Sequence, residues 1–148
     1  MEQVIRVQTQ EELDACLRIR QKVFVEEQQV PAELEIDDWD ASVTVCQHVL
    51  MKLDSQAVGA ARYRPYPDEP KLAKLQRFAV LKEYRGTGLG RKMLEKMEQY
   101  AQQDGYDGMI LDGQVRARPF YEKAGYAPVS EDIFMDAGIP HIQMVKRF

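Results

Sequence analysis

The sequence contains few of the residues that build metal and redox sites. Two cysteines, two histidines and one tryptophan occur among 148 residues. Cys46 and His48 are the one close cysteine–histidine pair, and two ligands cannot complete a tetrahedral zinc site. We therefore predict no metal ion, and we expect Cys16 and Cys46 to be reduced, small buried hydrophobes of a cytoplasmic protein.

Long apolar runs and an excess of positive charge are also missing. No stretch approaches the roughly 20 apolar residues that a bilayer span needs, and we recognise no secretory leader. The 20 basic and 24 acidic residues give a net charge of −4, which argues against a general nucleic-acid binder. We predict one soluble domain over residues 1–148 that binds neither nucleic acid nor membrane.

The charged residues are unevenly distributed along the chain. Residues 24–61 hold eight acids and one base, a local charge of −7, whereas residues 71–98 hold eight bases and three acids, a local charge of +5. Two solvated faces of opposite sign would explain this pattern. A protein that holds an anionic ligand on one side and a cationic ligand on the other would also explain it.

The hydrophobic periodicity predicts strands and helices in alternation. Thr9 and Glu12 form a capping-box pattern, after which Leu13 and Leu17 follow at helical spacing. Arg20 falls on the same apolar face, so we expect it to pair with a downstream carboxylate. The predicted helices are residues 10–23, 88–103 and 116–123, the predicted strands are residues 4–7, 43–51, 57–63, 72–80, 109–111, 126–129 and 142–145, and residues 26–40 are expected to form a loop or a short helix. This order mixes hairpins with crossovers, which is typical of an α/β fold with a mixed sheet.

The strand over residues 72–80 has an irregular apolar pattern. Ala73 and Leu75 occupy odd positions, whereas Phe78 and Val80 occupy even ones. A slip of one residue within a strand is what a β-bulge produces, because two residues then face one on the partner strand. We therefore predict a bulge between Leu75 and Phe78.

Three glycines within five positions separate this strand from the next helix. Residues 85–91 read Arg-Gly-Thr-Gly-Leu-Gly-Arg. Glycine permits positive φ and close approach of a ligand, and the start of a helix offers unpaired N–H groups, so this loop predicts an anion cradle suited to a phosphate or diphosphate. The spacing fits neither a Walker A loop nor the dinucleotide fingerprint, which needs glycine where Arg91 stands. A glycine-rich turn without a ligand is the alternative.

Two segments resemble the signatures of the GCN5-related N-acetyltransferase (GNAT) superfamily. Residues 85–90 are similar to its Gln/Arg-x-x-Gly-x-Gly/Ala motif, and residues 120–126, Phe-Tyr-Glu-Lys-Ala-Gly-Tyr, resemble its second motif. The interval between the motifs and the order of the predicted elements also fit. Residues 18–28 and 138–141 are similar to the small bacterial branch related to ElaA.

The resemblance implies a fold and an activity. The fold would be α/β, a single GNAT-like domain with a mixed, mostly antiparallel central sheet flanked by helices and a bulged, splayed fourth strand. The activity would be an acetyl-CoA-dependent N-acetyltransferase that transfers an acetyl group to a primary amine by direct transfer in a ternary complex. A non-catalytic acyl-CoA-binding sensor or scaffold is the alternative, and many relatives form homodimers.

The resemblance also assigns roles to individual residues. Tyr121 would protonate the departing thiolate, the backbone of residues 78–80 would hold the pantetheine arm, and a strand amide there would stabilise the oxyanion. Gln114 stands where the family often has asparagine. The implied cofactor-binding residues are Phe78, Ala79, Val80, Arg85, Gly86, Thr87, Gly88, Leu89, Gly90, Arg91 and Gln114.

Two parts of the site stay open at this point. The acidic stretch around residues 33–40 is the motive for expecting a cationic small molecule as acceptor. No general base can be identified from the sequence, and the candidates are Glu27, Glu35, Asp37, His48 and His141.

Overall fold

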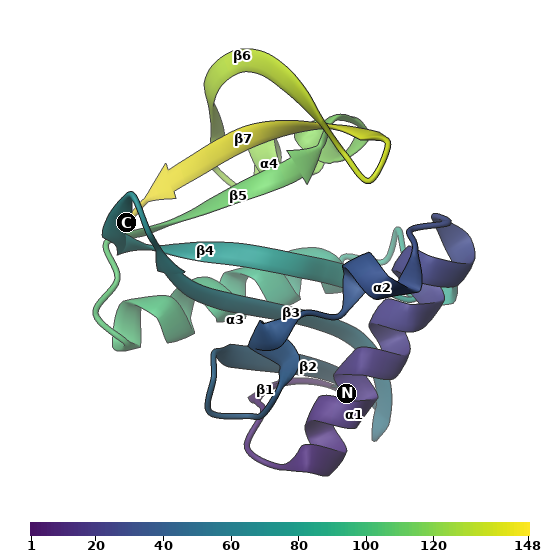
Figure 1. The fold of residues 1–148 in the computed structure, drawn as a ribbon. Coiled ribbons are helices and arrows are strands. Elements are labelled where there is room, and N and C mark those ends of the chain that lie inside the picture. Colours follow the sequence, from purple (N-terminus) through teal and green to yellow (C-terminus); the bar gives the residue numbers. More distant parts are fainter. The chain divides into compact units, whose positions relative to one another are not determined.

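Seven strands alternate with helices in the order that the sequence predicts (Figure 1). The structure, a computed structural model, describes residues 1–148. The strands are β1 (Glu2–Arg6), β2 (Gln47–Leu53), β3 (Gln56–Tyr66), β4 (Glu69–Val80), β5 (Gly108–Gln114), β6 (Ala127–Asp136) and β7 (Ile139–Arg147). The α-helices are α1 (Gln10–Arg20), α2 (Ala32–Glu35), α3 (Leu89–Gln103) and α4 (Arg118–Lys123). A π-helix, η1 (Gln21–Glu27), and three 3₁₀ turns, η2 (Asp38–Asp40), η3 (Lys82–Tyr84) and η4 (Val115–Ala117), complete the elements.

The strands form one mixed sheet, in the order β1-β2-β3-β4-β5-β7-β6. The pairs β1–β2, β2–β3, β5–β7 and β6–β7 are antiparallel, whereas β4 and β5 pair in parallel. This arrangement confirms the predicted α/β class with a mixed, mostly antiparallel sheet. By its internal contacts the chain divides into two compact units, residues 1–63 with 77–97 and residues 64–76 with 98–148.

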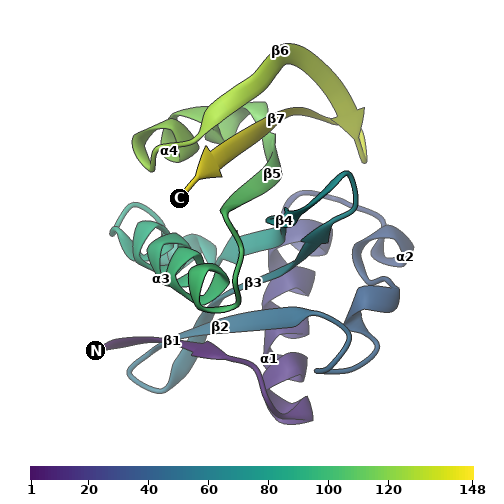
Figure 2. The same cartoon turned by 90° about the vertical axis from the view of Figure 1, so that its left-hand side faces the viewer.

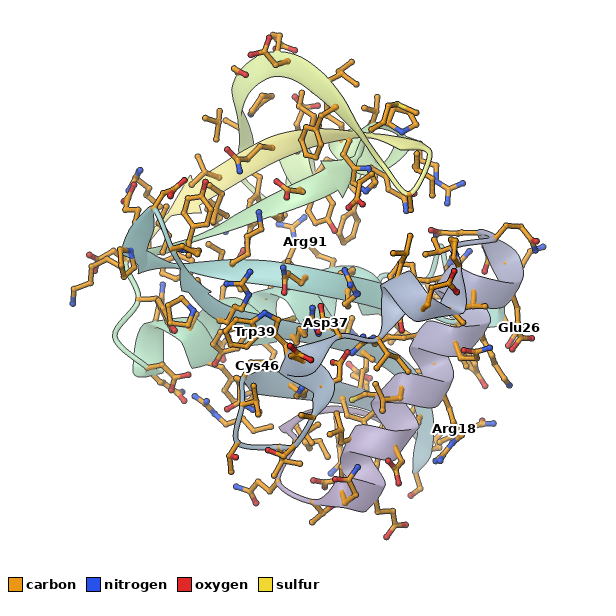
Figure 3. The ribbon with its side chains drawn as sticks, viewed as in Figure 1. Arg18, Glu26, Asp37, Trp39, Cys46 and Arg91 are labelled. Atoms are coloured by element: carbon orange, nitrogen blue, oxygen red, sulfur yellow. The ribbon has the colours of Figure 1, made fainter.

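In the first unit, helices cover both faces of the strands. Helix α1 and the first part of α3 lie on opposite sides of β2 and β3 (Figure 2). Leu13 and Cys16 of α1 pack in one core cluster with Leu50 of β2 and Ala60 of β3, while Arg18 points away from this face into solvent (Figure 3). Burial of such apolar side chains is the main stabilising contribution to the unit.

Helix α1 begins as predicted and ends differently. The capping box is present, because the Glu12 N–H donates to the Thr9 hydroxyl at 3.2 Å and the Glu12 carboxylate accepts from the Thr9 N–H at 3.1 Å. After Arg20 the chain continues as the π-helix η1, in which the Gln28 N–H bonds the Val23 carbonyl five residues back. The helical segment therefore reaches Glu27, four residues beyond the prediction.

Several predicted strand boundaries were wrong. Strand β2 begins at Gln47 rather than residue 43, because the Ser42 hydroxyl and carbonyl hold Thr44 and Val45 in a turn. Strand β3 reaches Tyr66 rather than residue 63, and β4 starts at Glu69 rather than residue 72. Strands β5, β6 and β7 are also longer than predicted.

The predicted irregularity of β4 is present at Arg77. This residue has a φ of +57°, in the left-handed region that few residues other than glycine adopt. It lies between Leu75 and Phe78, where the apolar pattern slips, and such a residue is typical of a bulge. The parallel pairing of β4 with β5 runs from Leu72 to Leu75, so it ends two residues before Arg77.

The second unit is built on β5, β7 and β6 with helix α4 (Figure 2). Tyr126, just before β6, donates from its hydroxyl to the buried carboxylate of Glu98 at 2.8 Å, and Lys146 of β7 binds the other oxygen of that carboxylate at 2.9 Å. These bonds satisfy a charged group that is costly to bury alone. None of the helices in either unit has the length and apolar content needed to cross a membrane.

Candidate functional site

The glycine loop has the open backbone that an anion cradle requires. Gly86 and Gly88 have φ angles of +76° and +84°, and no heavy atom lies within 4 Å of the position where a Cβ would stand at either residue. Glycine tolerates these angles because it has no Cβ. The space beside both residues is therefore free to admit a ligand close to the main chain.

The donors of the loop begin at Gly86 rather than at Arg85. The first hydrogen bond of α3 runs from the Lys92 N–H to the Gly88 carbonyl at 3.2 Å, so the N–H groups of residues 89–91 have no intrahelical acceptor. The Arg85 N–H instead donates to the Lys82 carbonyl at 3.3 Å. Thr87 closes the turn through its hydroxyl, which donates to the Tyr84 carbonyl at 2.7 Å.

The side chains of the two flanking arginines are both paired. Arg85 binds the Glu27 carboxylate through two nitrogens, at 2.5 and 2.8 Å, and its Nε donates to the Val80 carbonyl at 2.9 Å. The bond to Glu27 raises the pKa of Arg85. Arg91 forms an ion pair with Glu95, one turn along α3, at 2.9 Å.

Residues 78–80 follow the bulge directly and end β4. Ala79 and Val80 are buried and Phe78 is half-buried. The next N–H, that of Leu81, donates to the Val58 carbonyl of β3 at 2.9 Å, which fixes the end of β4 against its neighbour.

An ionic cluster, buried at Arg20, Arg62, Glu35 and Asp40, occupies the segment that the sequence predicts as an acidic face. Three basic and three acidic side chains form it: Arg20, Arg62, Arg77, Glu35, Asp37 and Asp40. Arg20 donates to Glu35 at 2.8 Å and to both Asp40 oxygens at 2.7 and 2.8 Å, which confirms the predicted carboxylate partner. Arg62 binds Asp37 through two nitrogens, each at 2.7 Å.

The cluster neutralises much of the local acidity. Burial opposes ionisation of Asp40, but the hydrogen bonds and charge of Arg20 outweigh it and hold the pKa of Asp40 well below its usual range. Burial likewise opposes ionisation of Asp37, and Arg62 lowers the pKa of that carboxyl. Arg77 donates to the Glu35 and Leu34 carbonyls at 3.0 and 3.3 Å, so the bulge residue holds α2.

His48 lies beside this cluster in a closed environment. Asp37, Trp39 and Cys46 gather on the segment that precedes β2 (Figure 3). The His48 Nε2 lies 3.1 Å from the Trp39 carbonyl and 3.4 Å from the Cys46 sulfur, and burial lowers the pKa of His48. Burial also raises the pKa of the Cys46 thiol to about 11, so both groups are neutral at pH 7.

Tyr121 is buried in the second unit. Its ring packs edge-on against Phe120 and Tyr126, with centroids 5.1 and 5.9 Å away. It also covers Gly113 of β5, where a Cβ would lie 3.2 Å from the ring. Burial raises the pKa of the Tyr121 phenol, which therefore keeps its proton at neutral pH.

Gln114 and His141 are direct cross-strand neighbours of β5 and β7. The His141 Nδ1 lies 2.7 Å from the Ile139 carbonyl, and because a carbonyl oxygen only accepts, Nδ1 is the donor of this bond. Gln114 accepts from Arg116 at 2.9 Å through its side-chain oxygen. Successive side chains of a strand point to opposite faces of the sheet. The Tyr121 ring covers one face of β5 at Gly113, so the side chains of Gln114 and His141 lie on the other face.

The structure thus gathers the predicted site residues into two groups. Residues 78–80 and 85–91, together with Glu27, Glu35, Asp37 and His48, belong to the first unit, and Gln114, Tyr121 and His141 belong to the second. Nowhere do three or more His, Cys, Asp or Glu side chains come together as ligands for a metal ion would.

Comparison with known proteins decides the family. The sequence model of the Acetyltransferase (GNAT) family matches residues 13–126. The chain belongs to this family. The match spans both motifs of the sequence analysis, so the GNAT resemblance is confirmed.

Individual GNAT relatives are similar to this chain over nearly its whole length. The Bacillus subtilis protein named "Uncharacterized N-acetyltransferase YjcF" is 41% identical over 137 residues, which cover 93% of this chain and 94% of YjcF. The crystal structure of Escherichia coli ElaA has a TM-score of 0.84 at 26% identity and covers 99% of both chains. An acyl-CoA N-acyltransferase from Pseudomonas aeruginosa has a TM-score of 0.83 at 27% identity, covering 99% of this chain and 98% of its own. As a GNAT protein, this chain is an acetyl-CoA-dependent acyltransferase.

The partners of several predicted site residues do not follow from the sequence. The acids of residues 33–40 suggest a surface for a cation, and no local pattern in the sequence indicates that Arg62 and Arg77 reach them. Glu27 is predicted only as a candidate base, and in the structure it binds Arg85. The excess of acids in residues 24–61 next to an excess of bases in residues 71–98 was the available signal.

Proposed function

We propose that this GNAT chain transfers the acetyl group of acetyl-CoA directly to a primary amine while both substrates are bound. The carrying observation is the loop over residues 86–88, where two left-handed glycines with free space beside them precede the 15-residue helix α3. The amino end of a helix offers unpaired N–H groups and a partial positive charge. Both features suit the diphosphate of coenzyme A.

In this proposal each backbone segment has a separate task. The N–H groups of residues 86–90 bind the diphosphate, and Arg91, whose side chain is 43% exposed, adds a positive charge from the first turn of α3. The backbone of residues 78–80 holds the pantetheine arm. Gln114 contacts the cofactor at the position where the family often has asparagine.

The reaction forms a carbon–nitrogen bond and breaks the carbon–sulfur bond of the thioester. The amine of a lysine-like acceptor, with a pKa near 10.4, is mostly protonated at pH 7, and its deprotonation costs roughly 4 kcal/mol. A backbone N–H at Ala79 or Val80 stabilises the negative oxygen of the attacked carbonyl. Tyr121 gives its phenolic proton to the departing sulfur, and a base takes the proton that the amine loses.

His141 is the base that we place first among the five candidates. Its Nδ1 donates to the Ile139 carbonyl, which makes Nε2 the nitrogen that would take the proton, and it neighbours Gln114. The other four candidates are engaged elsewhere: Glu27 with Arg85, Glu35 with Arg20, Asp37 with Arg62, and His48 with the Trp39 carbonyl. A base that is already bound to a cation loses basicity.

The acceptor in this proposal is a cationic small molecule. Glu35, Asp37 and Asp40 no longer support this choice, because arginines of the same chain neutralise them. Its remaining support is the exposed carboxylates of Glu33 and Asp38 in the same segment.

Two measurements test the proposal. Calorimetry should show that acetyl-CoA binds and that NAD and ATP do not. Release of free thiol from acetyl-CoA should then rise with at least one member of a panel of polyamines, aminoglycosides, amino sugars and peptides. Acetyl-CoA binding without thiol release on any amine would favour the non-catalytic sensor, and acetylation of only neutral or anionic amines would refute the cationic acceptor.

A further inference from the structure

Arg85, the first residue of the GNAT glycine motif, donates its hydrogen bonds to other groups of the protein. Its guanidinium makes two hydrogen bonds to Glu27 and one to the Val80 carbonyl, and its N–H donates to the Lys82 carbonyl. Arg85 therefore joins the end of β4 to the π-helix η1 at the point where the glycine loop begins. An arginine that binds the phosphates would instead point its guanidinium nitrogens at the ligand.

We infer that Glu27 and Arg85 are positioning residues that hold the start of the diphosphate loop in its binding conformation. The inference rests on the proposed function of that loop. It gives Glu27 an effect on the affinity for coenzyme A and no part in proton transfer. It also assigns the side chain of Arg85 to the protein rather than to the phosphates.

The Glu27–Arg85 ion pair is held by more hydrogen bonds than an ordinary surface ion pair. The two side chains are 38% and 31% exposed, and isolated pairs of this kind contribute little to stability. Here the guanidinium meets both carboxylate oxygens, a fork that fixes direction as well as distance. The third bond, to a main-chain carbonyl at 2.9 Å, fixes the same guanidinium to β4.

An anchor at this position matters because of the two glycines that follow it. Gly86 and Gly88 can adopt many conformations, and ordering them on binding reduces affinity. At the far end the loop is held by Leu89, which is buried at the start of α3. The Glu27–Arg85 ion pair supplies the corresponding anchor at the near end.

The π-helix places Glu27 for this contact. Glu27 is the last residue of η1, and directly after it the Gln28 N–H returns to the Val23 carbonyl at 3.1 Å. Gln29 then turns the chain away with a φ of +61°, and its side-chain amide donates to the Glu26 carbonyl at 2.8 Å. Glu27 therefore sits on an ordered end of the helix rather than in a loop.

Calorimetric titration of coenzyme A into the full chain and its variants tests the inference. Glu27→Gln and Arg85→Gln should each weaken the Kd roughly tenfold, and the double variant should be no weaker than the single ones, because the two residues act as one unit. Arg85→Lys keeps the positive charge but loses the two-bond contact with Glu27, so this variant should also bind coenzyme A more weakly. In turnover, Glu27→Gln should raise the KM for acetyl-CoA and leave kcat and its pH profile unchanged.

The outcomes separate the inference from its alternatives. Tighter binding by Glu27→Gln would show that Glu27 competes with phosphate for Arg85, and full affinity in Arg85→Lys would show a plain charge effect; either result overturns the inference. A lower kcat with an altered pH profile in Glu27→Gln would make Glu27 the base and also overturn it. If the unaltered chain binds no coenzyme A, the proposed function fails instead.

Glu69→Gln is the matched control. Glu69 forms a two-bond pair with Arg147, at 2.7 and 3.2 Å, of the same chemical type as the Glu27–Arg85 ion pair. This variant removes the same carboxylate charge and should leave the Kd for coenzyme A unchanged. An equal loss of affinity in Glu69→Gln would show a general charge effect and refute the positioning role.

Discussion

Arg20 of α1 binds both carboxylate oxygens of Asp40, at 2.7 and 2.8 Å, in a fully buried environment. Asp40 also forms an ion pair with Arg62, and the nearby Asp37 forms ion pairs with Arg62 and Arg77. The segment between η1 and β2 is therefore held by ion pairs between its carboxylates and arginines of neighbouring elements. Such buried groups stabilise a fold only while every charge keeps its partner.

Replacing Asp40 by Asn should strongly destabilise the protein. The variant leaves Arg20 and Arg62 buried with one negative charge fewer, and breaking one partner of a buried pair costs about 3–5 kcal/mol. Urea denaturation followed by circular dichroism measures this loss in the free energy of unfolding. Asp54→Asn is the control, because Asp54 pairs with the amino terminus in solvent; it should change the free energy by less than about 0.5 kcal/mol.

The same carboxylates should make stability depend on acid pH. Arg20 and Arg62 lower the folded-state pKa values of Asp40 and Asp37 below the unfolded value near 3.9. Their contribution is therefore fully present above that unfolded pKa and is lost as pH falls through the folded values. The free energy of unfolding should be nearly constant from about pH 7 to 5 and fall below about pH 4. A curve for Asp40→Asn with the same acid slope as the unaltered chain would contradict this assignment.

Local sequence patterns predicted much of the fold. The capping box of Thr9 and Glu12, the start of α3 after Gly88 and the irregularity at Arg77 each depend on residues near one another in the chain. Such features follow from hydrogen bonds and steric limits within a few residues, so the sequence contains their cause. The GNAT family followed in the same way from two short motifs.

Long-range partners could not be predicted from these patterns. Arg20 needed a carboxylate, but the choice of Glu35 and Asp40 depends on how α2 and η2 fold back on α1. The pairing of Arg85 with Glu27, 58 positions earlier in the chain, likewise depends on tertiary structure. Charge counts over a segment cannot show whether its acids meet solvent, substrate or internal arginines.

Tyr121→Phe should remove acid catalysis and little else. If Tyr121 protonates the departing sulfur as proposed, loss of the phenol should lower kcat by about 10²–10⁴-fold. The Kd for acetyl-CoA and the thermal midpoint should stay close to those of the unaltered chain. Because burial raises the pKa of Tyr121, the unaltered chain should lose no activity through this group up to about pH 10.

Tyr126→Phe is the control for that variant, since the two rings are in contact. Its hydroxyl donates to buried Glu98, so the variant should lose about 1–2 kcal/mol of unfolding free energy and retain kcat. If both variants lose activity in proportion to stability, the effect of Tyr121→Phe is structural. If Tyr121→Phe retains full kcat, the proton comes from another group.

Gly88→Trp should abolish binding of coenzyme A while the fold persists. The free space at Gly88 would admit the indole, which would then fill the volume that the diphosphate needs. The left-handed backbone makes the substitution cost roughly 1–2 kcal/mol, too little to unfold an ordinary domain. Calorimetry with coenzyme A and a thermal melt measure the two effects separately.

Gly105→Trp distinguishes loss of the site from backbone strain. Gly105, just after α3, has a φ of +93° and likewise has no heavy atom within 4 Å of the position of a Cβ. Both variants therefore place the same side chain on a left-handed backbone in open space, and they should lower the melting temperature by similar amounts. Only Gly88→Trp should lose coenzyme A, because only Gly88 precedes the free N–H groups of a helix start. Micromolar affinity retained in Gly88→Trp would show that the diphosphate does not bind at this loop.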